Sequence, residues 1–288
     1  MAQLAGTPGR LLVIADFDGT LAEITLDPMG AVIDPLARRA LRRLSSIAGR
    51  RPDRLMVTVL SGRTARDVAG RVRVGGIRYL GNHGNEEGWL PRRGVAERLA
   101  VELQPALRAR TDAARRLADA VAAAVAARLG HQRPPDWLFV EDKGPAVAFH
   151  YRNAPDTAEA HRVVHGALDD AGAGGLLAGY QRHEGRRVVE LQPDEAADKG
   201  IAARRLIDEI RPAALLVMGD DRSDALAFRA AADARASGRL VALNVAVHGA
   251  GETPPDVAAT ADLMLERPRQ AARVLRLLAR DLEGAGIA

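Results

Sequence analysis

The chain has 288 residues, of which 47% are hydrophobic and only 3% aromatic. This length predicts one medium domain that carries a smaller one, with aliphatic side chains filling the cores. Because there is no cysteine, disulfides, thiolate catalysis and cysteine-ligated zinc are excluded. The formal charge is +4, but the arginines are scattered through alanine-rich segments without interleaved aromatics, so nucleic-acid binding is not expected.

The first apolar run covers residues 11–15, which is too short for a signal peptide or a membrane span. We therefore expect a cytoplasmic protein without a membrane partner. The composition leaves the oligomeric state open.

Up to residue 103, predicted strands alternate with predicted helices. The first strand is a continuous apolar run of the kind that is buried on both faces of a parallel sheet. The predicted order is strand 11–15, helix 35–48, strand 55–60, a helix from residue 64, and strand 77–80. Alternation of this kind predicts a doubly wound α/β sheet.

The pattern changes after residue 103 and returns near residue 199. The middle segment predicts helix 103–129, strands 137–143 and 146–152, helix 157–171, and strands 176–183 and 187–192. Alternation then resumes with helix 200–210, strand 214–218, helix 224–234, strand 240–245 and helix 269–282. We therefore expect one α/β core, residues 1–103 and 193–288, interrupted by an α+β domain with an antiparallel sheet over residues 104–192.

Polar residues stand where several of the core elements end or begin. Asp16 and Asp18 follow the first strand, Ser61 follows the second, Asp220 and Asp221 follow strand 214–218, and Lys199 begins a helix. In open parallel sheets, ligands bind outside the carboxyl ends of the strands. The fold would therefore bring these groups to one edge of the sheet.

Asp16 and Asp18 are the candidate catalytic pair. A carboxylate directly after a buried strand can attack phosphorus and form an aspartyl-phosphate. A second carboxyl two residues later can protonate the leaving oxygen and then deprotonate the attacking water. The alternative is a solvated turn that contains two acidic residues.

Asp220 and Asp221 would repel Asp16 unless a cation neutralises them. Magnesium takes oxygen ligands and bridges carboxylates to a substrate phosphate, so we expect Mg²⁺ at this position. For Asp224, the alternative is an acidic helix start that caps the following helix.

Ser61 offers a hydroxyl, and Gly62 lies at a helix start where main-chain N–H groups suit phosphate oxygens. The alternative is that Ser61 is a plain helix N-cap. Lys199 and Lys143 are the only two lysines among 41 basic residues. They are candidates for positions where a compact point charge is required, and the Lys199 ammonium could neutralise charge on a transferring phosphoryl group. An ordinary surface lysine is the alternative.

These residues together resemble the motifs of the haloacid dehalogenase superfamily: Asp16-Phe17-Asp18-Gly19-Thr20-Leu21, Ser61-Gly62-Arg63, Lys199-Gly200, and Gly219-Asp220-Asp221-Arg222-Ser223-Asp224. The details are more similar still to trehalose-6-phosphate phosphatases. This second resemblance is carried by Gly81-Asn82-His83-Gly84 with Glu86, by Val140-Glu141-Asp142-Lys143-Gly144, and by His150-Tyr151-Arg152. It extends over residues 11–282.

The resemblance implies an α/β fold, with a Rossmann-like haloacid-dehalogenase core and an inserted α+β cap domain. It implies that Asp16 is the nucleophile, Asp18 the acid/base, and Ser61, Gly62 and Lys199 the phosphate-binding residues. Mg²⁺ would be bound by Asp16, the Asp18 carbonyl and Asp220, with Asp221 and Asp224 as possible supporting residues. In the cap, the resemblance assigns Glu141, Lys143, Arg152 and Arg187 to the sugar, although Arg187 stands where the family usually has lysine.

Strand periodicity supports a polar face in the cap independently. Glu141 and Lys143 are two residues apart and share one face of their strand, and His150 and Arg152 are expected to do the same. Such a face suits a hydroxyl-rich ligand. The alternative is an ordinary solvent-exposed sheet face.

The sequence also departs from the family pattern. Ser223 replaces a threonine, Ala225 and Leu226 replace acidic residues, Asn85 stands where an apolar residue is common, and the segment 192–199 is one residue longer. None of these changes removes the predicted nucleophile or metal ligands, but they leave the sugar open.

The sequence therefore predicts a magnesium-dependent phosphatase that hydrolyses trehalose 6-phosphate through an aspartyl-phosphate. The first alternative is a phosphatase of a related disaccharide or pseudo-disaccharide phosphate. A non-catalytic phosphosugar-binding regulator is the second, although Asp16 and Asp18 are both present. The expected partner is a small sugar phosphate.

Overall fold

The computed structural model describes residues 1–25, 30–248 and 254–287. The chain divides into two compact units. The core unit comprises Met1–Glu102 and Ala197–Ala288, and the inserted unit comprises Leu103–Ala196. Across the described ranges, no helix is both long and apolar enough to cross a membrane.

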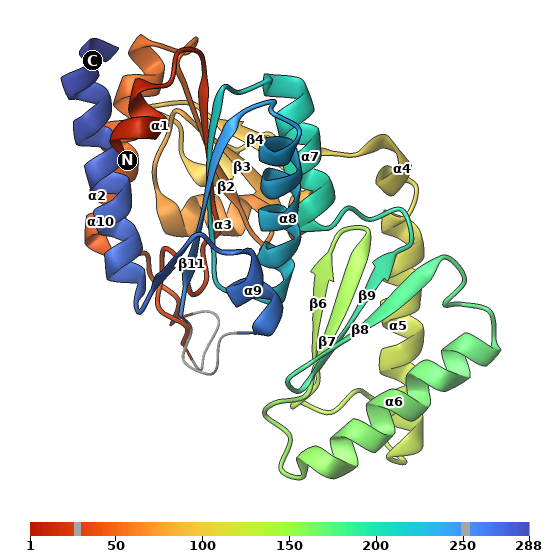
Figure 1. The fold of residues 1–288 in the computed structure, drawn as a ribbon. Coiled ribbons are helices and arrows are strands. Elements are labelled where there is room, and N and C mark those ends of the chain that lie inside the picture. The colour runs from red at the N-terminus through yellow and green to blue at the C-terminus, as the bar shows by residue number, and fades with distance from the viewer. Residues whose placement is uncertain (26–29, 249–253, 288) are drawn as a thin grey trace. The chain divides into compact units, whose positions relative to one another are not determined.

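An eight-stranded sheet forms the centre of the core unit (Figure 1). Its strand order is β12 (Leu263–Leu265), β11 (Val241–Val247), β10 (Ala214–Gly219), β1 (Leu11–Ala15), β2 (Leu55–Leu60), β3 (Ile77–Gly81), β4 (Glu86–Leu90) and β5 (Glu102–Leu103). Strands β12 to β3 are parallel, and β1 lies between β10 and β2. The parallel arrangement was predicted for all of these strands except β12, which was not predicted. Strand β4, which pairs antiparallel with β3, was not predicted. Its Glu-Glu-Gly-Trp-Leu sequence lacks the apolar run that marks the central strands.

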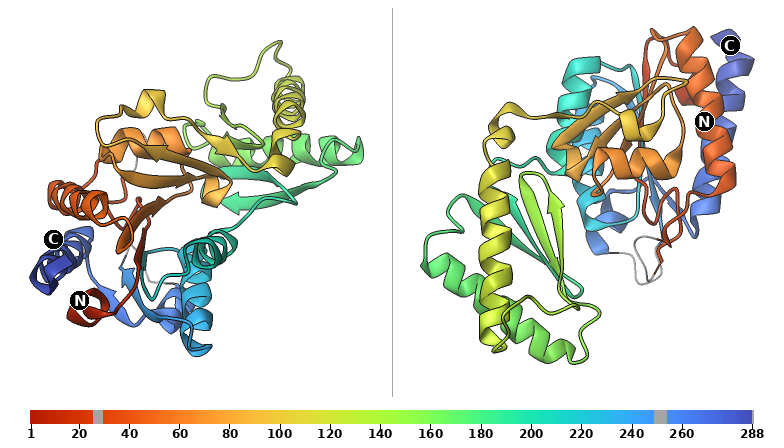
Figure 2. Two further views of the ribbon diagram at one scale, coloured as in Figure 1. Left: turned by 90° about the horizontal axis from the view of Figure 1, so that it is seen from above. Right: turned by 180° about the vertical axis from the view of Figure 1, so that it is seen from behind.

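Helices cover both faces of this sheet (Figures 1 and 2). One hydrophobic core lies under α1 (Ala2–Gly6), α2 (Pro35–Arg50), α3 (Ala65–Val72) and α10 (Pro268–Leu282). The other lies under α7 (Lys199–Ile210), α8 (Arg222–Ala236) and α9 (Pro255–Thr260). Because β1 is buried on both faces, the residue that follows it is held between two packed layers.

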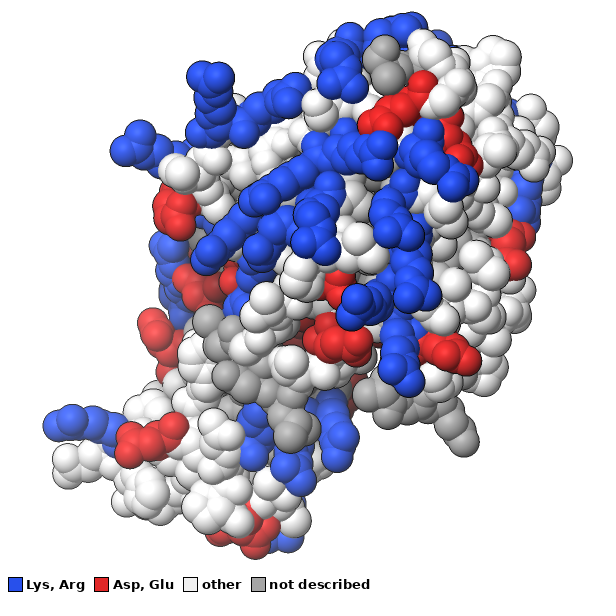
Figure 3. Space-filling view, turned by 90° about the vertical axis from the view of Figure 1, so that its left-hand side faces the viewer, with Lys and Arg blue, Asp and Glu red and all other residues white. Residues whose placement is uncertain are grey.

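The face of the molecule shown in Figure 3 carries many basic side chains. On this side lie α2 and α10, which contain nine arginines between them and a single acidic residue, Asp281. The apolar sides of both helices are buried in the core. The long arginine stems can cover the remaining apolar surface while the guanidinium groups stay in water.

The inserted unit has a four-stranded antiparallel sheet in the order β6 (Phe139–Lys143), β7 (Ala146–His150), β9 (Val188–Pro193) and β8 (Tyr180–Gly185). Helices α5 (Thr111–Arg128) and α6 (Thr157–Ala173) pack on it around Phe149, Val189 and Leu191. This arrangement confirms the predicted antiparallel α+β module.

Several element boundaries in this unit differ from the prediction, and three of these differences are informative. The expected helix 103–129 begins only at Pro105, a residue that suits the first turn of a helix, and a turn at residues 109–110 divides it into α4 (Pro105–Arg108) and α5. Strand β8 begins at Tyr180 rather than residue 176, since Gly175 and Gly179 adopt positive φ angles of 78° and 79° that an extended strand cannot hold. Strand β7 ends at His150, so Arg152 lies in a turn and does not share a strand face with His150.

Candidate functional site

Asp16 begins the site at the carboxyl end of β1. Its main-chain N–H donates to the Met218 carbonyl of β10 at 2.9 Å, which ties the ends of the two strands together. The Asp16 residue is only 4% exposed. The nucleophile candidate is therefore fixed at the sheet edge by main-chain pairing and by burial on both sides.

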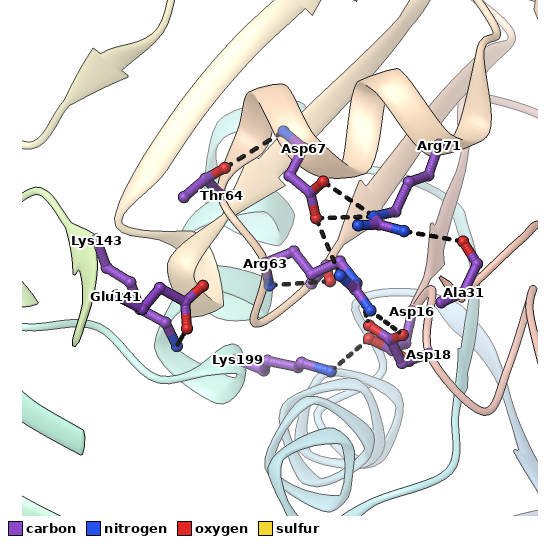
Figure 4. Close-up of polar contacts among 11 residues, drawn as sticks. Asp16, Asp18, Ala31, Arg63, Thr64, Asp67, Arg71, Glu141, Lys143 and Lys199 are labelled. Atoms are coloured by element: carbon purple, nitrogen blue, oxygen red, sulfur yellow. Dashed lines mark hydrogen bonds and ion pairs between the residues drawn. The ribbon is translucent and has the colours of Figure 1, made fainter. Parts of the chain in front are cut away.

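The Lys199 ammonium joins Asp16 to Asp224, as the close-up in Figure 4 illustrates for Asp16. Lys199 Nζ donates to Asp16 Oδ1 and to Asp224 Oδ1, each at 2.7 Å, and all three side chains are buried. Burial would lower the pKa of Lys199, but the charges of Asp16 and Asp224 raise it well above its usual value. Lys199 is thus a charged, buried lysine, and the surface-lysine alternative is wrong.

The cluster contains more carboxyl groups than cations. Burial raises the pKa of Asp16 to about 8, against the lowering effect of Lys199, and Asp220 and Asp221 raise it further. Burial also raises the pKa of Asp220 to about 8, with repulsion from Asp224 and Asp221 adding to the effect. Carboxylate oxygens of Asp16, Asp220 and Asp224 lie within 4.8 Å of one another. This donor set of hard oxygens fits a divalent cation such as Mg²⁺.

Gly19 makes room for this cluster. Its φ is +77°, and a Cβ atom built on it would lie 2.0 Å from Asp220 Oδ2. A side chain at this position would therefore be strained by the backbone and would displace the Asp220 carboxylate. The glycine of the Asp16–Thr20 motif is required by both constraints.

Asp221 and Asp224 form a capping box at the start of α8. Asp221 Oδ1 accepts the Asp224 main-chain N–H at 3.0 Å, and Asp224 Oδ2 accepts the N–H groups of Asp220 at 3.0 Å and Asp221 at 3.2 Å. The alternative that Asp224 helps to cap the following helix is therefore correct, but capping is not its only contact. Because its other oxygen contacts Lys199, Asp224 also connects the Asp220–Asp221 turn to the lysine.

Asp18 is held by Arg63, a contact that the sequence analysis did not predict (Figure 4). Arg63 Nε donates to Asp18 Oδ2 at 2.7 Å and Nη2 donates to Oδ1 at 2.8 Å, the bidentate geometry that fixes both partners. Arg63 Nη1 also donates to Asp67 Oδ2 at 3.0 Å.

Ser61 lies at the carboxyl end of β2 and is 1% exposed. The alternative that it is a helix N-cap is wrong, because Thr64 caps α3 by accepting the Asp67 N–H at 3.2 Å. Ser61 Oγ instead accepts the Arg63 N–H at 3.2 Å. Gly62 packs under the His83 ring, where a Cβ atom would lie 3.0 Å from the imidazole.

In the inserted unit, Glu141 and Lys143 point to the same side of β6, as predicted (Figure 4). Lys143 Nζ lies 4.0 Å from Glu141 Oε2 and 2.8 Å from Glu190 Oε2 of β9, a residue that the sequence analysis did not select. His150 Nε2 lies 2.9 Å from Glu141 Oε2. Burial opposes ionisation of Glu141, but the hydrogen bond with His150 and the charge of Lys143 prevail and lower its pKa.

Arg152 and Arg187 lie in turns beyond the ends of the strands. Arg187 has a positive φ of 62°, and its carbonyl accepts the Tyr151 N–H at 3.0 Å, so the two turns are adjacent. They stand at the His150 end of β7, whereas Lys143 pairs with Ala146 at the other end. The unit therefore brings Glu141 and Lys143 together, with the two arginines at one margin of the same sheet.

A second cluster of possible metal ligands lies in the inserted unit. Side-chain atoms of His161, His165 and Glu184 lie within 4.8 Å of one another, and the two imidazoles stack with centroids 3.7 Å apart. The Arg182 guanidinium contacts His165 Nδ1 and lies 3.2 Å from Glu184 Oε1. Its positive charge supplies the counter-charge to Glu184 and opposes a cation there.

Comparison with known proteins identifies the family. The model of a family described as Trehalose-phosphatase matches residues 14–262. A trehalose-phosphate phosphatase of Mycobacterium tuberculosis is 34% identical over 235 residues, which are 75% of this chain and 50% of that protein. A second Mycobacterium tuberculosis protein, termed an uncharacterized glycosyl hydrolase, is 32% identical over 286 residues, which are 97% of this chain and 19% of that protein.

The chain thus spans half or less of the length of these two relatives. Among solved structures, the C-terminal domain of a Candida albicans trehalose-6-phosphate phosphatase aligns with a TM-score of 0.67 at 21% identity. The alignment covers 94% of this chain and 93% of that domain, and it confirms the predicted haloacid-dehalogenase fold. With the family model matching most of its length, the chain belongs to the trehalose-phosphatase family.

Proposed function

We propose that this protein hydrolyses trehalose 6-phosphate to trehalose and phosphate in the presence of Mg²⁺. Family membership and the 34% identical trehalose-phosphate phosphatase support the substrate class. The observation that carries the chemistry is the buried contact of Lys199 with Asp16, next to the Arg63-bound Asp18. It combines a nucleophile, a counter-charge and a second carboxyl at one strand end.

In the first step, an Asp16 carboxylate oxygen attacks phosphorus, and the bond from phosphorus to the sugar oxygen breaks. Asp18 gives a proton to that oxygen, so trehalose leaves as a neutral alcohol. The bidentate contact with Arg63 holds the Asp18 side chain in one direction before it turns to the substrate. The product of this step is an aspartyl-phosphate on Asp16.

In the second step, Asp18 removes a proton from a water molecule, which attacks phosphorus and releases phosphate and the Asp16 carboxylate. The Lys199 ammonium and the Ser61 hydroxyl stabilise the phosphoryl oxygens in both steps, and the main-chain N–H of Gly62 adds a third donor. Ser61 is held at its strand end by its main-chain N–H, which donates to the Leu80 carbonyl at 3.0 Å, and Lys199 lies at the start of α7.

We further propose that Asp16, Asp220 and the main-chain carbonyl of Asp18 hold the metal. The Asp18 side chain turns to Arg63, which fits a role for the carbonyl rather than the carboxylate. When bound, Mg²⁺ supplies positive charge that keeps Asp16 ionised near neutral pH and reduces its repulsion of the phosphate. Asp221 and Asp224 would support this site through the turn that carries Asp220.

In the inserted unit, we propose that Glu141 and Lys143 bind sugar hydroxyls, with Arg152 and Arg187 at the margin of the site. The Glu141–His150 and Lys143–Glu190 contacts support this role because they orient both side chains without a ligand. Hydroxyl groups can both donate and accept, so an acidic and a basic residue on one sheet face match them. The cytoplasmic location expected from the sequence stays a prediction.

The test is phosphate release by the purified full chain with Mg²⁺ across a panel of sugar phosphates. We expect trehalose 6-phosphate to give the highest kcat/KM and Asp16→Asn to lower it by about 10³-fold or more. Faster hydrolysis of another disaccharide phosphate would support the first alternative instead. Binding of trehalose 6-phosphate without turnover, unchanged in Asp16→Asn, would support a regulatory protein.

A further inference from the structure

A strained loop follows β3 in the core unit. Asn82, His83 and Gly84 have consecutive positive φ angles of 46°, 59° and 103°. Two of these residues are not glycine, and a backbone conformation of this kind persists only where the surroundings impose it. The loop is therefore held by contacts that outweigh its strain.

One side of the loop is bonded to the segment that follows β2. The His83 N–H donates to the Ser61 carbonyl at 2.9 Å, and the Asn82 N–H donates to the Arg63 carbonyl at 2.8 Å. Glu86 fixes the loop from below by accepting the Ala65 N–H at 2.6 Å and the Asn82 side-chain amide at 2.7 Å. The loop thus follows the position of the Ser61–Arg63 segment.

The other side of the loop is bonded to the start of α7 through the Asn85 side chain, and farther along α7 Arg205 Nη2 donates to the Gly84 carbonyl at 3.2 Å. Asn85 Oδ1 accepts the Ala197 N–H at 2.7 Å, and Asn85 Nδ2 donates to the Ala197 carbonyl at 3.0 Å. These reciprocal bonds join residues 112 positions apart. Asn85 is only 5% exposed, and its Nδ2 also donates to the Asn82 carbonyl at 2.5 Å. Both its amide hydrogens and its oxygen are therefore in use.

Ala197 is two residues before Lys199, and Asp198 between them is the N-cap of α7. Because Asn85 fixes both main-chain groups of Ala197, it sets where the helix begins and hence where the Lys199 stem starts. Lys199 Nζ contacts Asp16 and Asp224 at 2.7 Å each, so a small shift of the helix start would change the distance between the ammonium and the Asp16 carboxylate.

We propose that Asn85 is a positioning residue for Lys199, which sets the ammonium at a fixed place relative to Asp16 and Ser61. This inference rests on the proposed role of Lys199 in holding the phosphoryl group. Asn85 does not touch the reacting atoms and acts through the main chain of Ala197. A short side chain with one donor and one acceptor is required, because an apolar residue would leave two main-chain groups of Ala197 without these bonds.

The matched control is Asn244 of β11, another buried asparagine of the core unit. Its Nδ2 donates to the carbonyls of Phe228 at 2.9 Å and Thr260 at 3.0 Å, and it has no place in the proposed chemistry. Asn85→Ala and Asn244→Ala each remove one buried amide that bonds main-chain groups. We expect both to lower thermal stability, and only Asn85→Ala to change the chemistry.

The first experiment compares kcat and KM for trehalose 6-phosphate in the two variants, together with amide hydrogen exchange at Ala197. We expect Asn85→Ala to lower kcat by about 10- to 100-fold with a smaller change in KM, and to raise the Ala197 exchange rate. Asn244→Ala should retain the wild-type kcat per folded molecule and the wild-type exchange rate at Ala197. Equal losses in the two variants, or unchanged exchange at Ala197 in Asn85→Ala, would overturn the proposal.

The second experiment uses Asn85→Asp. A protonated carboxyl can make both bonds to Ala197, whereas an ionised one turns an oxygen toward the Ala197 carbonyl and cannot donate. We therefore expect the ratio of its kcat to that of the wild type to rise as the pH falls, while the ratio for Asn85→Ala stays flat. A flat ratio for Asn85→Asp would count against the proposal.

A wild-type protein that hydrolyses none of the sugar phosphates would refute the proposed function but not this inference. The inference would then be decided by the dissociation constant for inorganic phosphate, measured in the same variants. A rise of about tenfold or more in Asn85→Ala but not in Asn244→Ala would support the positioning role. Equal affinities in the two variants would refute it.

Discussion

Replacing Lys199 by methionine removes an ammonium that contacts two buried carboxylates and leaves a side chain of similar length. Two charge-assisted hydrogen bonds of 2.7 Å are lost, to Asp16 and to Asp224. Leaving a buried charge without its partner costs about 3 to 5 kcal/mol, but a carboxylate avoids part of this cost by taking up a proton. We therefore expect the free energy of unfolding of the metal-free variant to fall by about 2 to 4 kcal/mol.

The effect on activity should be larger, because two losses combine. Removing a preorganised donor from a developing charge lowers kcat by about 10²- to 10³-fold. In addition, Lys199 lowers the pKa of Asp16, so without it the bound metal alone must keep Asp16 ionised. Any Asp16 that stays protonated cannot act as the nucleophile. Together we expect a decrease in kcat/KM of about 10³- to 10⁴-fold, or roughly 4 to 5.5 kcal/mol.

The assay is phosphate release from trehalose 6-phosphate at saturating Mg²⁺, with circular dichroism to show that the variant is folded. Lys199→Arg is the matched variant, since it keeps the charge but replaces a compact ammonium by a larger planar fork at a buried position. We expect it to lose about 100-fold or more in kcat/KM. A folded Lys199→Met protein with more than about a tenth of wild-type kcat/KM would refute the reasoning.

Four further predictions concern the metal, the turn, the acid/base and the sugar. The raised pKa of Asp16 and Asp220, each about 8, means that both are largely protonated at neutral pH without metal. These protons stabilise the metal-free fold at low pH, and that stability is lost as the pH rises from the unfolded value of 3.8 through about 8. Titration calorimetry should therefore show that Mg²⁺ binding releases protons and that the Mg²⁺ affinity rises up to about pH 8. Scanning calorimetry should show a larger metal-induced rise in Tm at about pH 8 than at about pH 6. Mg²⁺ binding that does not depend on pH would contradict this prediction. Gly19→Ala should lower the free energy of unfolding by about 1 to 3 kcal/mol and weaken Mg²⁺ binding. Urea titration with and without metal measures both effects. An unchanged Mg²⁺ affinity would contradict this prediction. Arg63→Ala should lower kcat by about tenfold or more, because Asp18 loses its bidentate partner, while Mg²⁺ affinity, measured by calorimetry, stays within about threefold; an unchanged kcat would argue against a positioning role. Glu141→Gln should raise KM for trehalose 6-phosphate by about tenfold but leave hydrolysis of p-nitrophenyl phosphate unchanged, and equal effects on both substrates would argue against a sugar contact.

The central sheet could be predicted because its sequence signal is local. Strands β1, β2 and β10 are apolar except for Thr58 of β2, and all or nearly all of their residues are buried. Strand β4 was missed because it contains Glu86 and Glu87, whose carboxylates have partners contributed by distant residues. Its antiparallel pairing with β3 is a consequence of the strained loop between them, which no periodicity reveals.

The helix starts were also predicted only in part. The sequence identified acidic and hydroxyl residues at the starts of α3 and α8 but did not distinguish capping residues from site residues. The structure assigns the cap of α3 to Thr64 and leaves Ser61 to the site, since the main chain turns between them. At α8, Asp224 serves both purposes, because its two oxygens face different partners.

By itself, the sequence determined the α/β class, the insertion after the first half of the core sheet, and the carboxylate pair of Asp16 and Asp18. These features depend on apolar runs, on turn residues and on the spacing of neighbours along the chain. Only the tertiary structure decided that Lys199 contacts Asp16 across 183 residues, that Arg63 holds Asp18, and that Asn85 pairs with Ala197. The reason is physical: each of these contacts requires a donor and an acceptor to meet within hydrogen-bonding distance, and that distance is set by how the sheet and its helices pack.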